Sequence, residues 1–189
     1  MAGAVVREVV CVFGASWAQP DTPLYAEGVS LGAALAAAGF DVCTGGYGGL
    51  MEAVSKGSAQ AGGGAVGVLV PSLFPQRAAS GNPYLTESVN APSLLTRIDA
   101  MLQRAPRLLV ALPGTLGTLT ELMAAWNVAL LAPIGGYEAA TLIAWRQPWE
   151  RIIRSVGEDL NLTPEQRACV VFVDSVEDCL AVIRARAGA

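Results

Sequence analysis

Short runs of apolar residues alternate along the chain with longer segments whose apolar positions recur at helical spacing. The short runs predict strands near residues 5–13, 40–43, 66–70, 107–112, 141–144 and 170–174. The longer segments predict helices near residues 23–38, 50–61, 93–104, 118–131, 149–156, 164–168 and 176–187. Such alternation is typical of an α/β fold, a doubly wound and mainly parallel sheet with helices on both faces.

Capping residues mark several boundaries of these elements. Thr22 before Pro23, and Thr163 before Pro164, each place a hydroxyl ahead of a proline at the first helical position. Gln166 completes a capping box at the second helix. Residues 71–92 are rich in Pro, Ser and Asn and predict one long loop, and loops of that length are often functional.

The composition predicts one domain over residues 1–189, because 53% hydrophobic and 15% charged positions suffice for one sizeable core. A net charge of -4 gives no basic field that would favour nucleic acid or an anionic membrane. The chain contains no histidine, which excludes Ser-His-Asp and Cys-His catalysis and the commonest zinc ligand, so no metal site is expected. Acid-base chemistry must come from carboxylates, tyrosines or the single lysine.

Cellular location is predicted from the cysteines and the apolar segments. The four cysteines are far apart in the sequence, which fits a reduced, cytoplasmic protein. The N-terminus lacks the pattern of a signal peptide. Glycines and prolines interrupt the uncharged segments 57–76 and 122–137, so neither is expected to span a membrane.

An anion site is predicted where the strand near 107–112 ends. Residues 113–118, with glycines at 114 and 117, lead directly into a helix whose first turn offers unpaired N–H groups and the positive end of its dipole to a phosphate. Glu121, one turn inside this helix, would repel that phosphate unless the two groups address different parts of one ligand. A nucleoside monophosphate has that shape, with an anion at one end and a cleavable C1'–N bond at the other.

Turns after four predicted strands, at residues 14–16, 44–46, 71–72 and 113–115, converge on one edge of the sheet. In doubly wound sheets the ligand crevice lies beyond the carboxyl ends of the strands. Residues 62–67 match G-x-G-x-x-G, but they precede a strand, so they predict a helix-to-strand turn and not a dinucleotide site.

Several stretches of the sequence, from residues 12–16 to residues 113–121, resemble the LOG family of cytokinin-activating phosphoribohydrolases. Residues 113–121 are similar to its PGGxGTxxE signature, residues 45–54 to its GGxxGLMGxV stretch, and Arg97 with Met101 to its RKxxM helix. The matches span about residues 5–132 in the family's order. The resemblance implies a Rossmann-like fold, a homodimer with the site near the subunit interface, and no metal or redox cofactor.

Three positions depart from the LOG pattern: Thr115 replaces the second glycine of PGG, Ile98 replaces the lysine after the arginine, and Glu52 replaces a glycine. Residues 51–57 and 82–85 look more like a sister group that includes molybdenum-cofactor carriers. Two functions therefore stay open, a hydrolase and a carrier of a nucleotide or molybdenum cofactor. A lysine decarboxylase, an old label of this family, needs a pyridoxal-phosphate lysine, for which only Lys56 is available.

The activity that the resemblance implies is hydrolysis of AMP or an N6-modified AMP to the free base and ribose 5-phosphate. Glu121 and Arg97 are the expected catalytic residues. Expected phosphate or nucleotide contacts are Gly14, Ser16, Thr44, Gly45, Gly46, Gly114, Thr115, Leu116, Gly117 and Thr118. In the long loop, Arg77, Asn82 and Tyr84 are weaker candidates, while Tyr47, Met51 and Trp126 suit the core or a subunit contact better.

Overall fold

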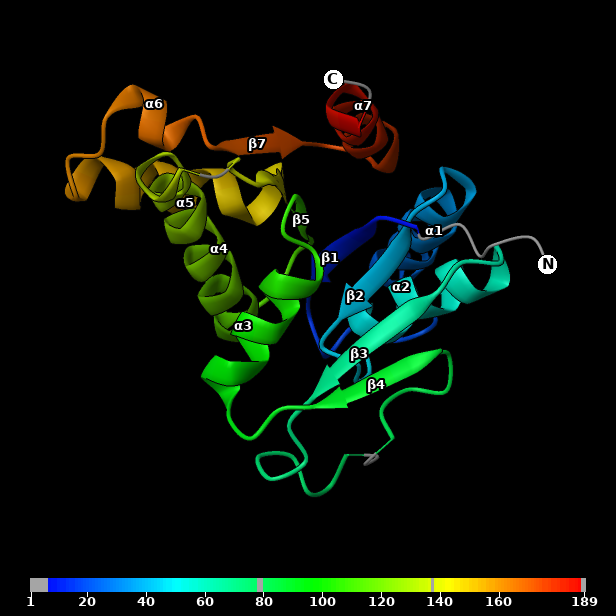
Figure 1. Ribbon diagram of the computed structural model, residues 1–189. Helices are drawn as coiled ribbons and strands as arrows, with labels where there is room; N and C mark the ends of the chain where they lie inside the picture. Colours follow the sequence, from blue (N-terminus) through cyan, green and yellow to red (C-terminus); the bar gives the residue numbers. More distant parts are fainter. Residues whose placement is uncertain (1–6, 78–79, 137, 188–189) are drawn as a thin grey trace.

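Seven parallel strands form one sheet at the centre of the molecule (Figure 1). The computed structural model describes residues 7–77, 80–136 and 138–187. The strands are β1 (Val9–Phe13), β2 (Asp41–Thr44), β3 (Ala65–Leu69), β4 (Glu87–Asn90), β5 (Leu108–Ala111), β6 (Thr141–Trp145) and β7 (Val170–Val173). Their order is β4-β3-β2-β1-β5-β6-β7, and each neighbouring pair is parallel. The strand order therefore reverses at β1, which is where such sheets form a ligand crevice.

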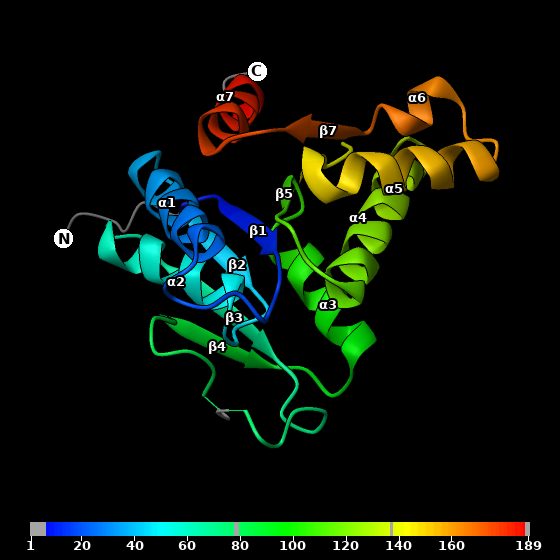
Figure 2. The ribbon, with the colours of Figure 1, turned by 180° about the vertical axis from the view of Figure 1, so that it is seen from behind.

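Helices cover both faces of this sheet. They are α1 (Pro23–Ala37), α2 (Leu50–Gln60), α3 (Leu94–Arg104), α4 (Leu116–Gly135), α5 (Arg146–Asp159), α6 (Pro164–Arg167) and α7 (Val176–Ala187). Figures 1 and 2 show α1, α2 and α7 on one face, and α3, α4 and α5 on the other. The prediction of a doubly wound α/β fold is confirmed.

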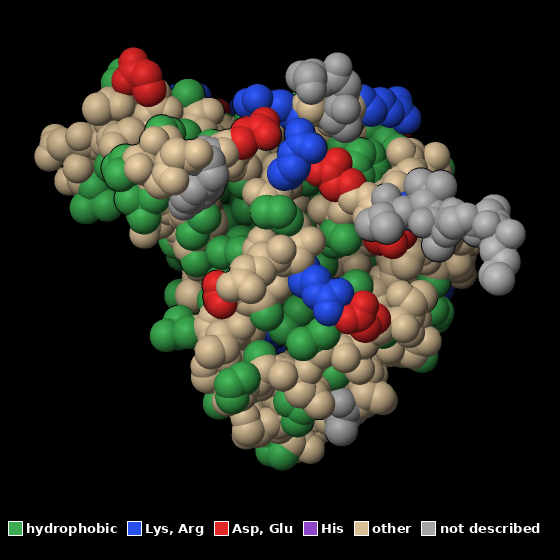
Figure 3. Space-filling view, in the orientation of Figure 1, with side chains coloured by type: hydrophobic (Ala, Val, Ile, Leu, Met, Phe, Trp, Pro, Cys, Tyr) green, Lys and Arg blue, Asp and Glu red, His purple; other side chains and the backbone are tan. Residues whose placement is uncertain are grey.

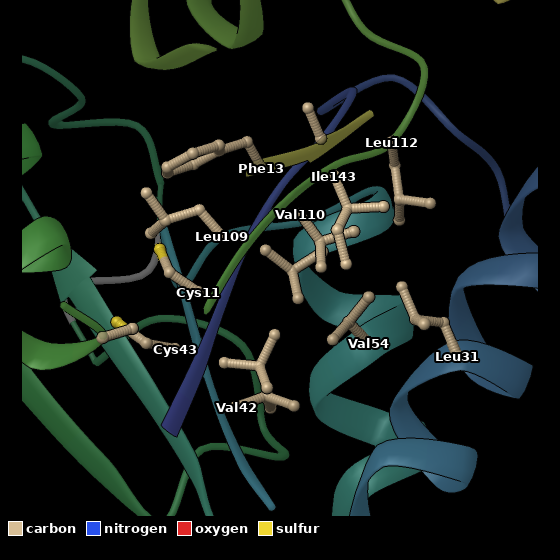
Figure 4. Close-up of a cluster of buried hydrophobic side chains, with 14 of the residues drawn as sticks. Cys11, Phe13, Leu31, Val42, Cys43, Val54, Leu109, Val110, Leu112 and Ile143 are labelled. Atoms are coloured by element: carbon tan, nitrogen blue, oxygen red, sulfur yellow. The ribbon is translucent and has the colours of Figure 1, made fainter. Parts of the chain in front are cut away.

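The core explains why the strands appear in the sequence as continuous apolar runs. In the register of the sheet, Cys11 lies opposite Cys43 on one side and Leu109 on the other. Figure 4 shows these three side chains on one face of the sheet, while Val42 and Val110 point to the other face, toward α1 and α2. All five are buried. Because helices cover both faces, neither set of alternating positions can be polar.

The predicted caps are present. Thr22 Oγ1 accepts a hydrogen bond from the backbone N–H of Tyr25 at 3.3 Å, with Pro23 at the first helical position. Thr163 and Gln166 form the capping box, through bonds of 3.3 and 2.9 Å. Gly62–Gly64 make the predicted helix-to-strand turn, with Gly62 at a φ of 77°.

The prediction of one loop over residues 71–92 is wrong at its C-terminal end, because residues 87–90 form β4. This strand lies at the edge of the sheet and pairs only with β3. Three of its four side chains are exposed, and only Val89 packs against the core. An edge strand with one half-buried position has no apolar run to mark it, and its backbone bonds to β3 decide its conformation.

Other boundaries also differ from the prediction, and α5 extends three residues beyond the predicted range at each end. The first strand begins at Val9, and residues 5–6 of the predicted range lie outside the described residues. Helix α4 begins two residues earlier than predicted and continues through Pro133 to Gly135. By length and composition α4 could cross a membrane, but in this fold part of it, including Glu121 and Trp126, is buried within the protein.

Helices α1 and α2 pack closely because glycines remove side chains from their contact. A Cβ on Gly32 would overlap the carbonyl oxygen of Val54, and a Cβ on Gly57 would overlap that of Val29. The backbone of each helix thus occupies the space where a side chain of the other helix would lie.

We predict that Gly32→Ala destabilises the protein, although alanine is the better helix former by ~1 kcal/mol. The added methyl group would push α2 away and lower the free energy of unfolding by about 1–3 kcal/mol. Urea denaturation measures this loss. The control is Ser30→Ala on the exposed side of α1, with an expected change within ~0.5 kcal/mol. A Gly32→Ala protein more stable than the wild type would contradict the packing described.

Candidate functional site

The turn before α4 is tied to the turn after β1 at the carboxyl edge of the sheet. The backbone N–H of Ala15 donates to the carbonyl of Pro113 at 3.1 Å. Thr115 is the N-cap residue of α4, but its side chain forms no capping hydrogen bond. The first N–H groups of α4 are therefore not satisfied by a side-chain cap, and a bound anion at this end would accept hydrogen bonds from them.

A buried ion pair joins α3 to α4 beside this turn. Arg97 Nη1 lies 3.0 Å from Glu121 Oε1, and the two residues are only 6% and 7% exposed. Arg97 Nε also donates to the carbonyl of Val68, the penultimate residue of β3, at 2.8 Å. A Cβ at Gly45 would overlap the Arg97 guanidinium, so this glycine of the second turn makes room for the arginine.

Burial and the ion pair act on the Glu121 carboxyl in opposite directions. Burial raises the pKa of Glu121, because a carboxylate loses its hydration there, while the charge and hydrogen bond of Arg97 lower this pKa. The result is a pKa above the ordinary value for glutamate. A carboxyl with a raised pKa at the wall of a cavity is a candidate for proton transfer or for stabilising a cation.

A cavity of about 190 Å³, which we call the α4 hollow, opens beside the ion pair. It is lined by Gly14, Ser16, Met51, Phe74, Arg77, Leu94, Arg97, Thr115, Gly117, Thr118, Thr120 and Glu121. A second cavity of about 420 Å³, the loop hollow, is lined by Ser16, Tyr47, Gly48, Glu52, Arg77, Gly81, Asn82 and Pro83. Because Ser16 and Arg77 line both cavities, the two hollows adjoin each other.

The structure brings most of the predicted site residues to the α4 hollow. Its lining contains Gly14, Ser16, Thr115, Gly117, Thr118 and both expected catalytic residues. Five others lie elsewhere: Thr44, Gly45 and Gly46 are buried, Gly114 packs against Thr118, and Leu116 is 76% exposed. Thr44 Oγ1 accepts a hydrogen bond from the N–H of Gly46 at 3.1 Å. This bond stabilises the turn at 44–46, whose Gly45 lies against the Arg97 guanidinium.

Several lining residues were not predicted. Met51, which the sequence places in the core, is buried and also reaches the α4 hollow, where its sulfur lies 3.8 Å from Arg97 Nη2. Phe74 comes from the loop after β3, and Leu94 from the start of α3. Arg77, one of the weaker candidates named in the long loop, also lines this hollow. Met51 lies two residues after the last glycine of the second glycine turn, a position that could have indicated a site residue, whereas no local pattern marks Phe74 or Leu94.

A family model matches residues 7–141, which cover the sheet from β1 into β6 and the whole α4 hollow. The chain belongs to the SLOG cluster4 family. For this SLOG protein, the predicted likeness to LOG proteins with features of molybdenum-cofactor carriers is confirmed at the level of the superfamily. A search of curated proteins finds no significant match to the chain.

Solved structures similar to this SLOG protein share its whole fold. The molybdenum cofactor binding protein from the phototrophic bacterium Rippkaea orientalis has a TM-score of 0.74 at 20% identity, covering 96% of this chain and 98% of its own. The molybdenum cofactor carrier protein of Chlamydomonas reinhardtii has a TM-score of 0.72 at 18% identity, covering 97% and 100%. The protein TM1055 has a TM-score of 0.69 at 25% identity, covering 95% and 99%.

We predict that Arg97→Met lowers the free energy of unfolding by about 3–5 kcal/mol at neutral pH, because Glu121 is left buried without its partner. The substitution removes the influence that lowers the pKa of Glu121, so that pKa rises further above its value in the unfolded chain. A carboxyl with a raised folded pKa binds protons more tightly in the native state, and stability then falls as pH rises. The loss should therefore be larger at pH 8 than at pH 5.

Denaturation of the Arg97→Met protein and the wild type at both pH values tests this prediction. The control is Arg104→Met, which breaks an exposed ion pair with Glu87 on β4. It should cost at most about 1 kcal/mol, with little change between the two pH values. Equal losses for the two variants would mean that the buried pair contributes no more than a surface one.

Proposed function

We propose that this protein hydrolyses the N-glycosidic bond of a nucleoside 5'-monophosphate, AMP or an N6-modified AMP, to the free base and ribose 5-phosphate. The observation that carries the proposal is the buried Arg97–Glu121 pair in the wall of the α4 hollow, next to the uncapped start of α4. In this arrangement the start of α4, where we place the phosphate, and a carboxyl group with a raised pKa share one cavity.

The phosphate of the substrate would bind at the start of α4. Backbone N–H groups of the first turn and the hydroxyl of Thr118 supply its hydrogen bonds, and Gly117, where a Cβ would meet no other atom, leaves room for it. The phosphate lies far from the bond that breaks, so its binding energy serves to position the C1' atom.

Glu121 would act at the C1' atom of the ribose. As the C1'–N bond breaks, positive charge builds on the sugar, as in glycoside hydrolysis, and a nearby carboxylate stabilises it. The oxygen of a water molecule then bonds to C1', and its proton leaves through Glu121 to the base. Arg97 would hold Glu121 in place and stabilise the departing base. Hydrolysis of this kind involves no change of oxidation state.

A carrier is the second candidate, favoured by one observation: two of the similar solved structures are named as a molybdenum cofactor binding protein and a molybdenum cofactor carrier protein. At 18–20% identity they share the fold with this chain. A carrier of a phosphorylated pterin or nucleotide would use the same helix end. A carrier does not need a carboxylate at C1', so the effect of replacing Glu121 distinguishes the two functions.

We predict that Glu121→Gln lowers the rate of adenine release from AMP by about 10²–10⁴-fold. AMP binding should persist or tighten, because a negative charge near the phosphate is removed. Chromatography of the reaction mixture measures adenine, and calorimetry measures binding. Arg97→Ala should also slow the reaction, whereas Thr115→Gly, which restores the LOG glycine, should leave the rate unchanged or raise it.

Tight AMP binding without adenine release over hours, in the wild type and in Glu121→Gln alike, would identify a carrier instead. A nucleotide bound reproducibly away from residues 114–118 in a crystal would contradict the phosphate position in both functions.

We predict a homodimer, which the LOG resemblance implies and the surface of α3 and α4 supports. Large hydrophobic side chains are exposed there, including Leu95 at 74% and Ile134 at 83%, and Figure 3 shows hydrophobic side chains over this part of the molecule. Light scattering should give a mass near twice 19.5 kDa or a higher even multiple. A stable monomer at micromolar concentration would contradict a site near a subunit interface.

The proposed partners are small phosphorylated molecules, with no role for nucleic acid, in agreement with the net charge of -4. We also propose a cytoplasmic location. All four cysteines are free, and burial raises the pKa of Cys11 and raises that of Cys179 to about 12, so these two thiols stay protonated and unreactive.

A further inference from the structure

The α4 hollow is too small to hold a nucleotide by itself. Its volume of about 190 Å³ lies below the ~300–1,000 Å³ of ordinary ligand pockets. The adjoining loop hollow adds about 420 Å³ and is reached past Ser16 and Arg77. For a ligand with its phosphate at the start of α4, the loop hollow is the adjoining space for its other end.

Arg77 forms the boundary between the two hollows. Its guanidinium lies 4.5 Å from the ring centre of Phe74 and 5.0 Å from that of Tyr47, and these rings hold it by cation–π contacts. Among the described residues Arg77 has no acidic partner. The positive charge of Arg77 is therefore available to a ligand in the α4 hollow and to one in the loop hollow.

Glu52 supplies the one carboxylate in the described lining of the loop hollow, and a hydrogen bond to one of its oxygens orients it. Its Oε1 atom accepts a hydrogen bond from the Tyr25 hydroxyl at 2.9 Å. Burial, and then the bond to Glu52, raise the pKa of Tyr25, so this hydroxyl stays a donor throughout the neutral range. The only hydrogen bond of the Glu52 side chain within the described residues is this one, and it has no ion pair among them.

The neighbouring polar side chains Lys56 and Asn82 form no hydrogen bond or ion pair with Glu52 among the described residues. Lys56, one turn further along α2, lies 5.9 Å from the ring centres of Tyr25 and Tyr84 and is not within ion-pair distance of Glu52. The amide nitrogen of Asn82 donates to the carbonyl of Tyr47 at 3.2 Å, and its oxygen accepts from the N–H of Tyr84 at 3.1 Å. Asn82 is therefore committed to the fold of the loop.

We propose that Glu52 is a specificity-determining residue, which accepts a hydrogen bond from an amino group on the heterocycle of the bound ligand. The inference rests on the proposed function, since it takes the phosphate to lie at the start of α4. An ionised carboxylate only accepts hydrogen bonds, so it favours an N–H donor and disfavours a second anion. The substrate class is then an amino-substituted base with one phosphate, and N6-modified AMP keeps the required N–H.

The test compares two nucleotides that differ only in this amino group, AMP and purine riboside 5'-monophosphate. Calorimetry on the wild-type protein should show AMP binding about tenfold or more tightly, as for one hydrogen bond to a charged group. Glu52→Gln keeps an oxygen for the Tyr25 hydroxyl but loses the charge. It should weaken AMP binding until the preference is about threefold or less, and leave purine riboside 5'-monophosphate binding unchanged.

Unchanged binding of purine riboside 5'-monophosphate shows that the Glu52→Gln protein is folded. The matched control is Glu177→Gln, at an exposed position on α7, which should keep the wild-type preference for AMP. An equal loss for both nucleotides, or an unchanged preference, would overturn the inference while leaving the proposed function intact. Loss of preference in a protein that releases no adenine would refute the hydrolase and support Glu52. Wild-type protein that binds neither nucleotide would overturn both.

Discussion

The Arg97–Glu121 ion pair is the interaction on which the site depends. Two charges only 6% and 7% exposed require each other, because either alone would be buried without compensation. The pair fixes α3 against α4 and reaches the sheet through the Arg97 bond to the carbonyl of Val68. It also explains Gly45, since any larger residue would occupy the position of the guanidinium. One pair of side chains thereby couples two helices, the third strand and the second glycine turn.

Because these two charges compensate each other, they leave the α4 hollow nearly neutral. Attraction for an anion must then come from the first turn of α4 and from Arg77, which the loop after β3 carries to the boundary of the two hollows. The protein as a whole is acidic, with a net charge of -4, so the attraction is local. Glu52 lines the loop hollow and not the α4 hollow.

The fold supports both a hydrolase and a carrier, since a crevice at the switch point of a parallel sheet serves any phosphorylated ligand. The similar solved structures agree over almost the whole chain at 18–25% identity, which reflects a shared framework of strands, turns and helices. What distinguishes the functions is the chemistry beside the anion site. A buried carboxylate with a raised pKa next to the helix end is an arrangement that holding a ligand does not require, and this is why the hydrolase is preferred.

The sequence by itself determined the features that depend on local order along the chain. Buried parallel strands appear as apolar runs, caps depend on neighbouring residues, and the turn at 113–118 joins one strand to one helix, so the α/β fold and the strand–turn–helix at 113–118 could be predicted. β4 could not, because its conformation comes from backbone bonds to β3 and not from its own side chains. The lining by Phe74 and Leu94, and the close contact of Gly45 with the Arg97 guanidinium, were decided by the tertiary structure alone. These contacts join residues far apart in the sequence, and only the packing of helices and loops onto the sheet brings them together.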